Sequence, residues 1–198
     1  MTDLLVDSLP TVWHGRRIDP DFRHMVRLAN ASRHGELRED DLTAVREILT
    51  LFYREPVCVD RSAEAFRDML EFFLSGEQSA APTGHTEDSP GNGPVFDYRC
   101  DAPYIVAAFQ QTYGIDLTTA YLHWFRFRAL FAALPEDTLM AKIMVWRSAD
   151  LADYEGSMRE HYAALKERFA LPADLCGGAA VVQTVAEHDA AFLARFRH

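Results

Sequence analysis

Residues Phe96 to Arg147 read FDYRCDAPYIVAAFQQTYGIDLTTAYLHWFRFRALFAALPEDTLMAKIMVWR. This stretch is rich in aromatic side chains, and a core can form around it. It contains two apolar stripes at helical spacing: Tyr104, Ile105, Ala108 and Phe109, then Leu122, Phe125, Ala129 and Ala132 or Ala133. The stripes predict two helices packed face to face. No pair of polar residues in the stretch has the spacing that a metal, a phosphate or a nucleophile requires. The residues alone therefore predict a helical domain and do not name a reaction.

Length and composition indicate one ordinary folded protein. The chain has 198 residues, of which 48% are hydrophobic and 25% are charged, and this is typical of a globular protein with a core. The periodic segments predict a mainly α protein, a multi-helix orthogonal bundle with a short N-terminal β-hairpin. We expect residues 1–171 to form a single helical domain with a flexible acidic loop at 76–94 inside it. We expect residues 172–198 to form a C-terminal extension with a short helix.

Acidic residues are concentrated in the middle of the chain. The formal net charge is −10, which argues against a nucleic-acid partner, because such binding neutralises phosphates with Lys and Arg. Residues 55–101 contain ten acidic side chains and three arginines, whereas residues 102–150 contain four acidic and four basic ones. A basic partner surface would be steered to the acidic region.

Cysteine spacing and the N-terminus predict the compartment. Cys58, Cys100 and Cys176 lie far apart and form no CxxC pair, so neither a zinc site nor a disulfide framework is predicted. The N-terminal sequence MTDLLVDSLP has no basic region or apolar run of a signal peptide, and the chain has no run of eighteen apolar residues. We expect a protein of the reducing cytoplasm that is neither secreted nor membrane-spanning.

Start and stop signals divide the N-terminal part into a hairpin and three helices. The run from Leu9 to Ile18 predicts a hairpin that turns at His14-Gly15. Asp19-Pro20 predicts the start of the first helix, acids at Glu39 to Asp41 that of the second, and Asp60 or Ser62 that of the third. Their predicted apolar faces are Phe22, Met25, Val26 and Ala29; Leu42, Val45, Leu49 and Phe52; and Phe66, Met69, Leu70, Phe73 and Leu74.

The remaining signals place the later helices. Asp101 as N-cap and Pro103 in the first turn predict a helix that ends at Gly114, and Asp116 or Thr118 predicts the start of a helix that runs to Leu134. Thr138 begins a helix that ends at Arg147, where a cation complements the helix dipole. Residues 151–169 follow as a polar-faced helix with an apolar stripe, Tyr154, Met158, Tyr162, Leu165 and Phe169.

The third predicted helix has an apolar face wider than the narrow stripe that packing on one neighbour requires, because Phe72 stands beside Phe73. One hypothesis is that part of this face binds a partner protein. The candidate protein-binding residues are Phe66, Leu70, Phe72, Phe73 and, in the C-terminal extension, Phe192 and Phe196. The alternative is that these aromatics belong to the core, which is the ordinary place for such residues.

Three chemical hypotheses compete with structural interpretations. The run His123 to Arg128 could stack nucleic-acid bases, but on a helix Phe125 faces the core while Arg126 points elsewhere. Asp97, Asp101 and Asp116 could bind a divalent cation, but two of them are expected to cap helices. His14, His24 and His34 recur at intervals of ten, which is not a ligand spacing. We therefore expect no catalytic residue, metal or cofactor.

Several motifs in the same order resemble one known family. They are LPTVWHGRRIDPDFR at Leu9 to Arg23, LFY at Leu51 to Tyr53, EFF at Glu71 to Phe73, YGIDL at Tyr113 to Leu117, HW at His123-Trp124 and KIMVWR at Lys142 to Arg147. Together they resemble the bacteriophage gene-product-fifteen family, small proteins of tailed phages and prophages. The resemblance spans roughly residues 9–170 and does not extend to the segment after Leu171.

The resemblance implies a role in building the phage tail. Members of the family are typically encoded between the tail-tube protein and the tape-measure protein, where tail assembly chaperones are found. This implies a non-catalytic helper in the cytoplasm of the bacterial host, with the tape-measure and tail-tube proteins as partners and a homo-oligomer as a further possibility. The alternative is a structural virion protein of the tail or head-tail connector. The family contributes no catalytic residues.

Overall fold

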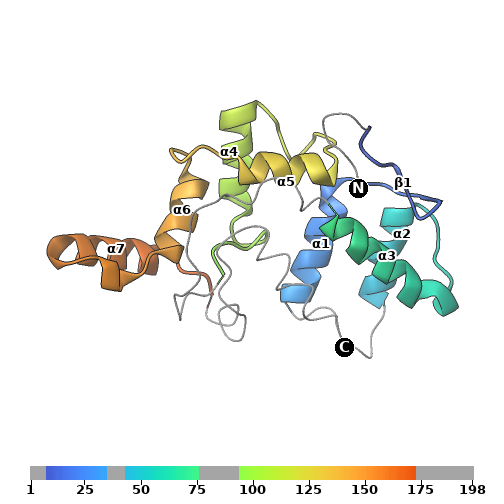
Figure 1. Ribbon diagram of the computed structural model, residues 1–198, viewed down its shortest axis with the longest axis horizontal. Helices are drawn as coiled ribbons and strands as arrows, with labels where there is room; N and C mark the ends of the chain where they lie inside the picture. The colour runs from blue at the N-terminus through green and yellow to red at the C-terminus, as the bar shows by residue number, and fades with distance from the viewer. Residues whose placement is uncertain (1–7, 35–42, 76–93, 173–198) are drawn as a thin grey trace. The chain divides into compact units, whose positions relative to one another are not determined.

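The computed structural model describes residues 8–34, 43–75 and 94–172 (Figure 1). These residues form seven α-helices, two short 3-10 helices and one two-stranded hairpin, which confirms a mainly α protein with an N-terminal hairpin. Every helix among them is too short or too polar to cross a membrane. The predicted loop at 76–94 and the C-terminal extension lie almost wholly outside the described residues.

The chain divides into two compact units. The first comprises Met1–Ala81 and Thr119–Ala132, and the second comprises Pro82–Thr118 and Ala133–His198. The elements of the first unit are β1 (Val12–Trp13), β2 (Arg16–Arg17), α1 (Phe22–Arg33), α2 (Thr43–Tyr53), η1 (Val59–Arg61), α3 (Ser62–Leu74) and α5 (Trp124–Ala132). Those of the second unit are α4 (Ala102–Tyr113), α6 (Leu139–Ser148), η2 (Leu151–Asp153) and α7 (Gly156–Arg168).

The predicted hairpin is present at its predicted turn. Val12 pairs with Arg17, and Trp13 pairs with Arg16, in antiparallel register. The two turn residues both have positive φ, +46° at His14 and +75° at Gly15. A two-residue turn of this kind matches the twist of the strands, and glycine adopts its second position without steric cost.

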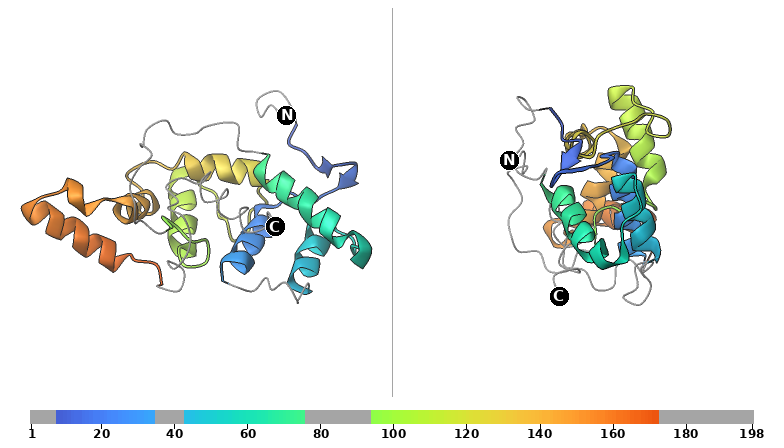
Figure 2. Two further views of the ribbon diagram at one scale, coloured as in Figure 1. Left: turned by 60° about the horizontal axis from the view of Figure 1, so that its bottom comes forward. Right: turned by 90° about the vertical axis from the view of Figure 1, so that its right-hand side faces the viewer.

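Aromatic side chains fill the core of the first unit. Helix α2 packs against both α1 and α3, and α1 also packs against α5, as Figures 1 and 2 show. The ring of Phe72 lies 4.9 Å from Phe125, and Phe73 stacks on Trp124 at 4.8 Å. The fully buried rings of this unit are Phe52, Phe72, Phe73, Trp124, Phe127 and Phe131. Burial of each large apolar side chain contributes about 1.5–3 kcal/mol to folding.

Helix α5 begins later than predicted, and it buries a different face. The backbone before it is extended: Phe22 donates its N–H to the carbonyl of Leu122 at 2.9 Å, and Trp124 donates to that of Pro20 at 2.7 Å. A segment that pairs in this way cannot also form helical bonds, so the predicted start at Asp116 or Thr118 is wrong. The buried face consists of Trp124, Phe125, Phe127, Arg128 and Phe131, whereas Ala129, Ala132 and Ala133 are exposed.

Helix α1 also begins after its predicted start. Its N-cap is Asp21 instead of Asp19, and the Asp21 side chain accepts the N–H of Arg23 at 2.9 Å. Asp19 is engaged elsewhere, since its carboxylate binds Arg54. A competing tertiary partner for the first acid therefore moved the helix start by two positions from Pro20 to Phe22.

In the second unit, α6 packs against both α4 and α7. Asp101 is the N-cap position of α4 and Gly114 is its left-handed C-cap with φ of +65°, both as predicted. Thr138 caps α6, as predicted, by accepting the N–H of Ala141 at 3.3 Å. Helices α4 and α5 of the predicted face-to-face pair belong to different units, in which α4 packs on α6 and α5 packs on α1.

A buried ion pair connects the segments of the second unit. Arg147 donates from Nη1 and Nη2 to the two oxygens of Asp101, at 2.6 and 2.9 Å. It also donates to the carbonyls of Val95 at 3.1 Å and Phe169 at 2.6 Å. The Asp101 and Arg147 side chains are only 1% and 8% exposed. The helix-dipole explanation for Arg147 is thus incomplete, and the carboxylate of Asp101 binds a cation instead of capping its helix.

Replacing Arg147 with Met is expected to destabilise the protein by about 3–5 kcal/mol, because it leaves the buried Asp101 carboxylate without its charge partner. Urea unfolding followed by circular dichroism measures this change. Arg159→Met, on the exposed side of α7, is the matched control and should change the unfolding free energy by less than about 0.5 kcal/mol. Equal unfolding midpoints for the two variants would contradict the assignment.

Candidate partner-binding surface

The surface predicted on the third helix is largely part of the core. Phe72 and Phe73 on α3 are fully buried, and Phe66 and Leu70 are half-buried. Phe192 and Phe196 lie outside the described residues. The rings around Phe72 come from Trp13, Phe52, His123 and Phe125. Phe72 and Phe73 therefore make core contacts, which is the alternative that the sequence left open.

The end of α3 is also engaged by polar groups from α5. The indole Nε1 of Trp124 donates to the carbonyl of Phe73 at 3.0 Å, and Nη1 of Arg128 donates to the same oxygen at 3.3 Å. These bonds satisfy a carbonyl of the last turn of α3, a turn whose carbonyls lie at the end of the helical hydrogen-bond ladder. Sequence reasoning placed Phe125 in the core and Arg126 outside, which is confirmed, but did not anticipate the burial of Arg128.

Helix α7 exposes apolar surface in the second unit. None of its residues is buried. The predicted helix at residues 151–169 is corrected, because a 3-10 helix occupies Leu151–Asp153 and α7 begins only at Gly156, so Tyr154 and Phe169 of the predicted apolar stripe lie outside it. The ring of Tyr154 stacks on that of Tyr162 at 4.2 Å, and the ring of Phe169 stacks on that of Trp146 at 5.1 Å. Met158, which lies between Tyr154 and Tyr162 in the sequence, is 53% exposed. Figures 1 and 2 show α7 extending away from α6. A methionine on such a surface can adapt its shape to an apolar partner.

Two polar contacts fix the C-terminal end of α7. Lys166 donates from Nζ to the carbonyl of Ala149, after the end of α6, at 2.8 Å. Arg147 binds the carbonyl of Phe169. Burial lowers the pKa of Lys166, an effect that the Asp150 carboxylate opposes. These two contacts hold α7 near its C-terminus. On α6, the apolar side chains of Leu139 and Val145 are also exposed.

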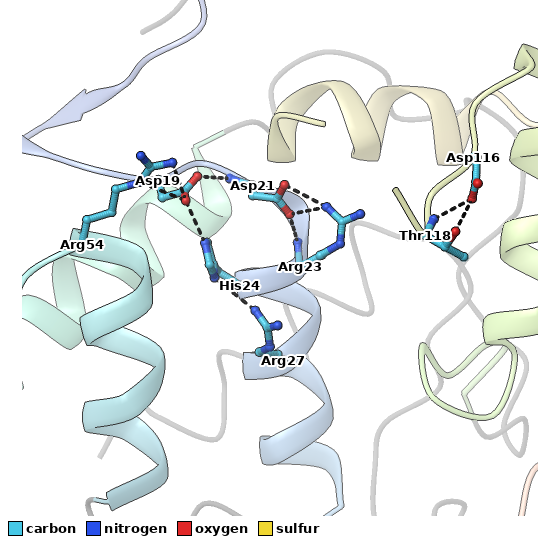
Figure 3. Close-up of polar contacts among 8 residues, drawn as sticks. All are labelled: Asp19, Asp21, Arg23, His24, Arg27, Arg54, Asp116 and Thr118. Atoms are coloured by element: carbon cyan, nitrogen blue, oxygen red, sulfur yellow. Dashed lines mark hydrogen bonds and ion pairs between the residues drawn. The ribbon is translucent and has the colours of Figure 1, made fainter. Parts of the chain in front are cut away.

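A polar cluster in the first unit joins the start of α1 to the end of α2 (Figure 3). The Asp19 carboxylate accepts from Arg54 Nε at 3.1 Å and Nη2 at 2.8 Å, and it lies 3.4 Å from His24 Nε2. Asp21 accepts from Arg23 Nη1 at 2.9 Å. Because each carboxylate is paired with a cation within the cluster, it is best explained as a structural network.

Burial and hydrogen bonding shift the pKa values of three side chains in this unit. Burial alone would raise the pKa of Asp19, but hydrogen bonds from Arg54 and His24 outweigh it, and the pKa is lowered. Burial lowers the pKa of His24 despite the nearby Asp19 carboxylate. Burial also lowers the pKa of His123, whose side chain is as inaccessible to solvent as that of His24.

His123 has a structural role that the sequence did not reveal. Its Nε2 lies 3.1 Å from the carbonyl of Pro10, and its Nδ1 lies 3.1 Å from the backbone nitrogen of Phe125. A neutral ring that donates from Nε2 and accepts at Nδ1 satisfies both contacts. His123 therefore joins the segment before β1 to the first turn of α5.

The three aspartates considered for a divalent cation have separate partners. Asp97 Oδ1 accepts the N–H groups of Arg99 and Cys100 at 2.9 and 2.8 Å. Asp116 Oδ1 accepts from the N–H and hydroxyl of Thr118 at 2.8 and 2.6 Å (Figure 3). Asp101 binds Arg147. Among the described residues, the one group of clustered metal-type donors does not include these aspartates.

The comparison with family models adds an assignment. The model described as "Bacteriophage Gp15 protein" matches residues 1–171. The chain belongs to the bacteriophage Gp15 family. The resemblance inferred from the motifs is thereby confirmed, and the Gp15 protein is a phage structural or tail-related protein. Searches of curated proteins and of solved structures found no match. The match ends at the predicted boundary before residues 172–198.

Stability of the Gp15 protein is expected to fall as pH is lowered through about 6.5, the ordinary pKa of the two depressed histidines. The unfolded chain then gains protons that the folded state takes up only at lower pH. Urea unfolding at pH 7.5 and 5.5 measures the loss. His123→Gln should make it smaller, whereas His161→Gln, at an exposed site on α7, should leave it unchanged. Equal losses in all three proteins would show that His123 does not contribute.

Proposed function

We propose that this Gp15 protein is a tail assembly chaperone that binds the tape-measure protein and recruits tail-tube subunits without catalysis. Family membership supports a role in phage assembly, and the family resemblance supplies the two partners. The proposal places the protein in the cytoplasm of the bacterial host during assembly. A chaperone of this kind would leave before the particle is complete.

The observation that carries the proposal is the state of α7. This helix contributes no buried residue, and its apolar side chain Met158 is 53% exposed. Exposed apolar surface is disfavoured unless another surface covers it. A helical partner can cover it, because an amphipathic helix places residues at i, i+4 and i+7 along one line.

The chemistry of the partner fits this surface. A tape-measure protein is expected to be a long amphipathic helix whose apolar stripe would aggregate if it stayed uncovered. Tyr162 lies one helical turn from Met158 on α7 and adds aromatic area, together with Tyr154, which stacks on it from just before the helix. The net charge of −10 would speed association with a basic partner more than it would tighten the complex.

A single charge on α7 is expected to weaken the complex. Met158→Glu should reduce affinity for the co-expressed tape-measure protein at least tenfold, which corresponds to about 1.4 kcal/mol. Leu51→Glu is the matched control, since it places the same charge on an exposed apolar residue of α2 in the first unit. Affinity is measured by titration of the purified proteins, and loss of binding in both variants would not support α7 as the surface.

The composition of finished particles separates the chaperone from the virion-component alternative. We expect the protein to be absent from purified virions and its deletion to yield filled heads without tails. Quantitative mass spectrometry of purified particles provides the measurement. A fixed number of copies per virion would instead establish a structural component of the tail or connector.

A further inference from the structure

Three metal-type donors meet where the hairpin lies against α3. His14 Nε2, a carboxylate oxygen of Asp68 and a carboxylate oxygen of Glu71 all lie within 4.8 Å of one another. We propose that these residues bind one divalent transition-metal ion of the zinc class. This site is independent of the proposed chaperone role, and all three residues belong to the first unit.

The fold positions the donors through rigid elements. His14 is the first residue of the hairpin turn, and the neighbouring Trp13 ring packs against buried Phe72 of α3 at 5.5 Å. Asp68 and Glu71 are three residues apart on α3, so their side chains lie on one face. Trp13 thus holds the hairpin on the helix and brings His14 over the two carboxylates.

The distances suit a shared ion. His14 Nε2 lies 3.2 Å from Glu71 Oε2. Ligands about 2.0–2.2 Å from a tetrahedral zinc ion are about 3.3–3.6 Å from each other. One pair of donors therefore already has the required spacing. The side chains of His14 and Glu71 are 48% and 58% exposed. The Asp68 oxygen lies within 4.8 Å of both donors, so small side-chain rotations can bring it to the ion without disturbing the core.

The donor set selects the class of ion. Two carboxylates balance the charge of a divalent cation, and the neutral imidazole nitrogen favours zinc-like ions over Mg²⁺ and Ca²⁺, which prefer oxygen. The Glu71 carboxylate lies at hydrogen-bond distance from His14, and the Asp68 carboxylate has no hydrogen bond or ion pair with another described residue. Within the protein the Asp68 charge acts on Tyr53 of α2: burial raises the pKa of the Tyr53 hydroxyl to about 12, and the Asp68 carboxylate contributes to this rise.

The site could not be found from sequence spacing. His14 is separated from Glu71 by 57 positions, so no local motif connects them, and the intervals of ten between histidines had predicted no metal. A bound ion would join the hairpin turn to α3. Its expected consequence is a more stable first unit with the ion than without it.

Titration of the untagged full-length protein with ZnCl2 tests the site. Isothermal calorimetry should show one saturable site per chain. His14→Asn, Asp68→Asn and Glu71→Gln should each weaken it more than about tenfold, because even the loss of an outer-shell partner typically costs about 10–100-fold in metal affinity. Matched controls are His161→Asn on α7 and Glu64→Gln on α3, both exposed positions, and both should retain the affinity of the original chain.

Two further measurements decide the outcome. Zinc should raise the melting temperature of the original chain and leave that of Glu71→Gln unchanged, while circular dichroism without metal confirms that the variants fold. Mg²⁺ should give no saturable binding at the same concentrations. The proposal is overturned if His14→Asn binds zinc as tightly as the original chain, if no saturable site appears, or if Mg²⁺ binds equally well.

Discussion

The second unit depends on a guanidinium group that is removed from water. A buried charge costs several kcal/mol unless a partner and hydrogen bonds compensate it. Arg147 obtains this compensation from the Asp101 carboxylate and from the carbonyls of Val95 and Phe169. These contacts come from the segment before α4, from the N-cap of α4 and from the C-cap of α7. One side chain of α6 thereby specifies where three other segments lie.

The same arrangement explains why α7 is exposed. Contacts to Ala149 and Phe169 hold the helix close to its C-terminal end, and none of its residues is buried. Met158 is 53% exposed, which leaves apolar surface for another molecule. The proposed chaperone role therefore rests on this exposed part of α7, whereas α3, which is richer in aromatics, is covered by α5 and the hairpin.

The first unit illustrates that perturbed ionisation does not by itself indicate catalysis. Asp19, His24 and His123 have shifted pKa values because they are buried and paired. Asp19 and His123 also join segments that are distant in sequence, Asp19 with Arg54 and His123 with Pro10. Structural ion pairs perturb pKa values in the same direction as active sites do. The exposed group of His14, Asp68 and Glu71 differs, since its donors converge at the surface.

Local signals in the sequence predicted a mainly helical protein well. The hairpin at His14-Gly15, the N-cap position at Asp101, the cap at Thr138 and the C-cap at Gly114 were all predictable, because turn and cap chemistry acts between residues a few positions apart. Motif order also identified the family. Errors occurred where a distant partner competed, as with the start of α5 beyond the extended segment at Leu122.

The sequence by itself therefore determined the fold class, the hairpin, several helix ends and the family. Only the tertiary structure decided which apolar faces are covered, that Arg147 is a buried ion-pair partner and not merely a helix-end cation, and that His14 meets Asp68 and Glu71. The physical reason is range. Capping and periodicity depend on neighbours along the chain, whereas burial and charge pairing depend on segments that folding brings together from tens of residues apart.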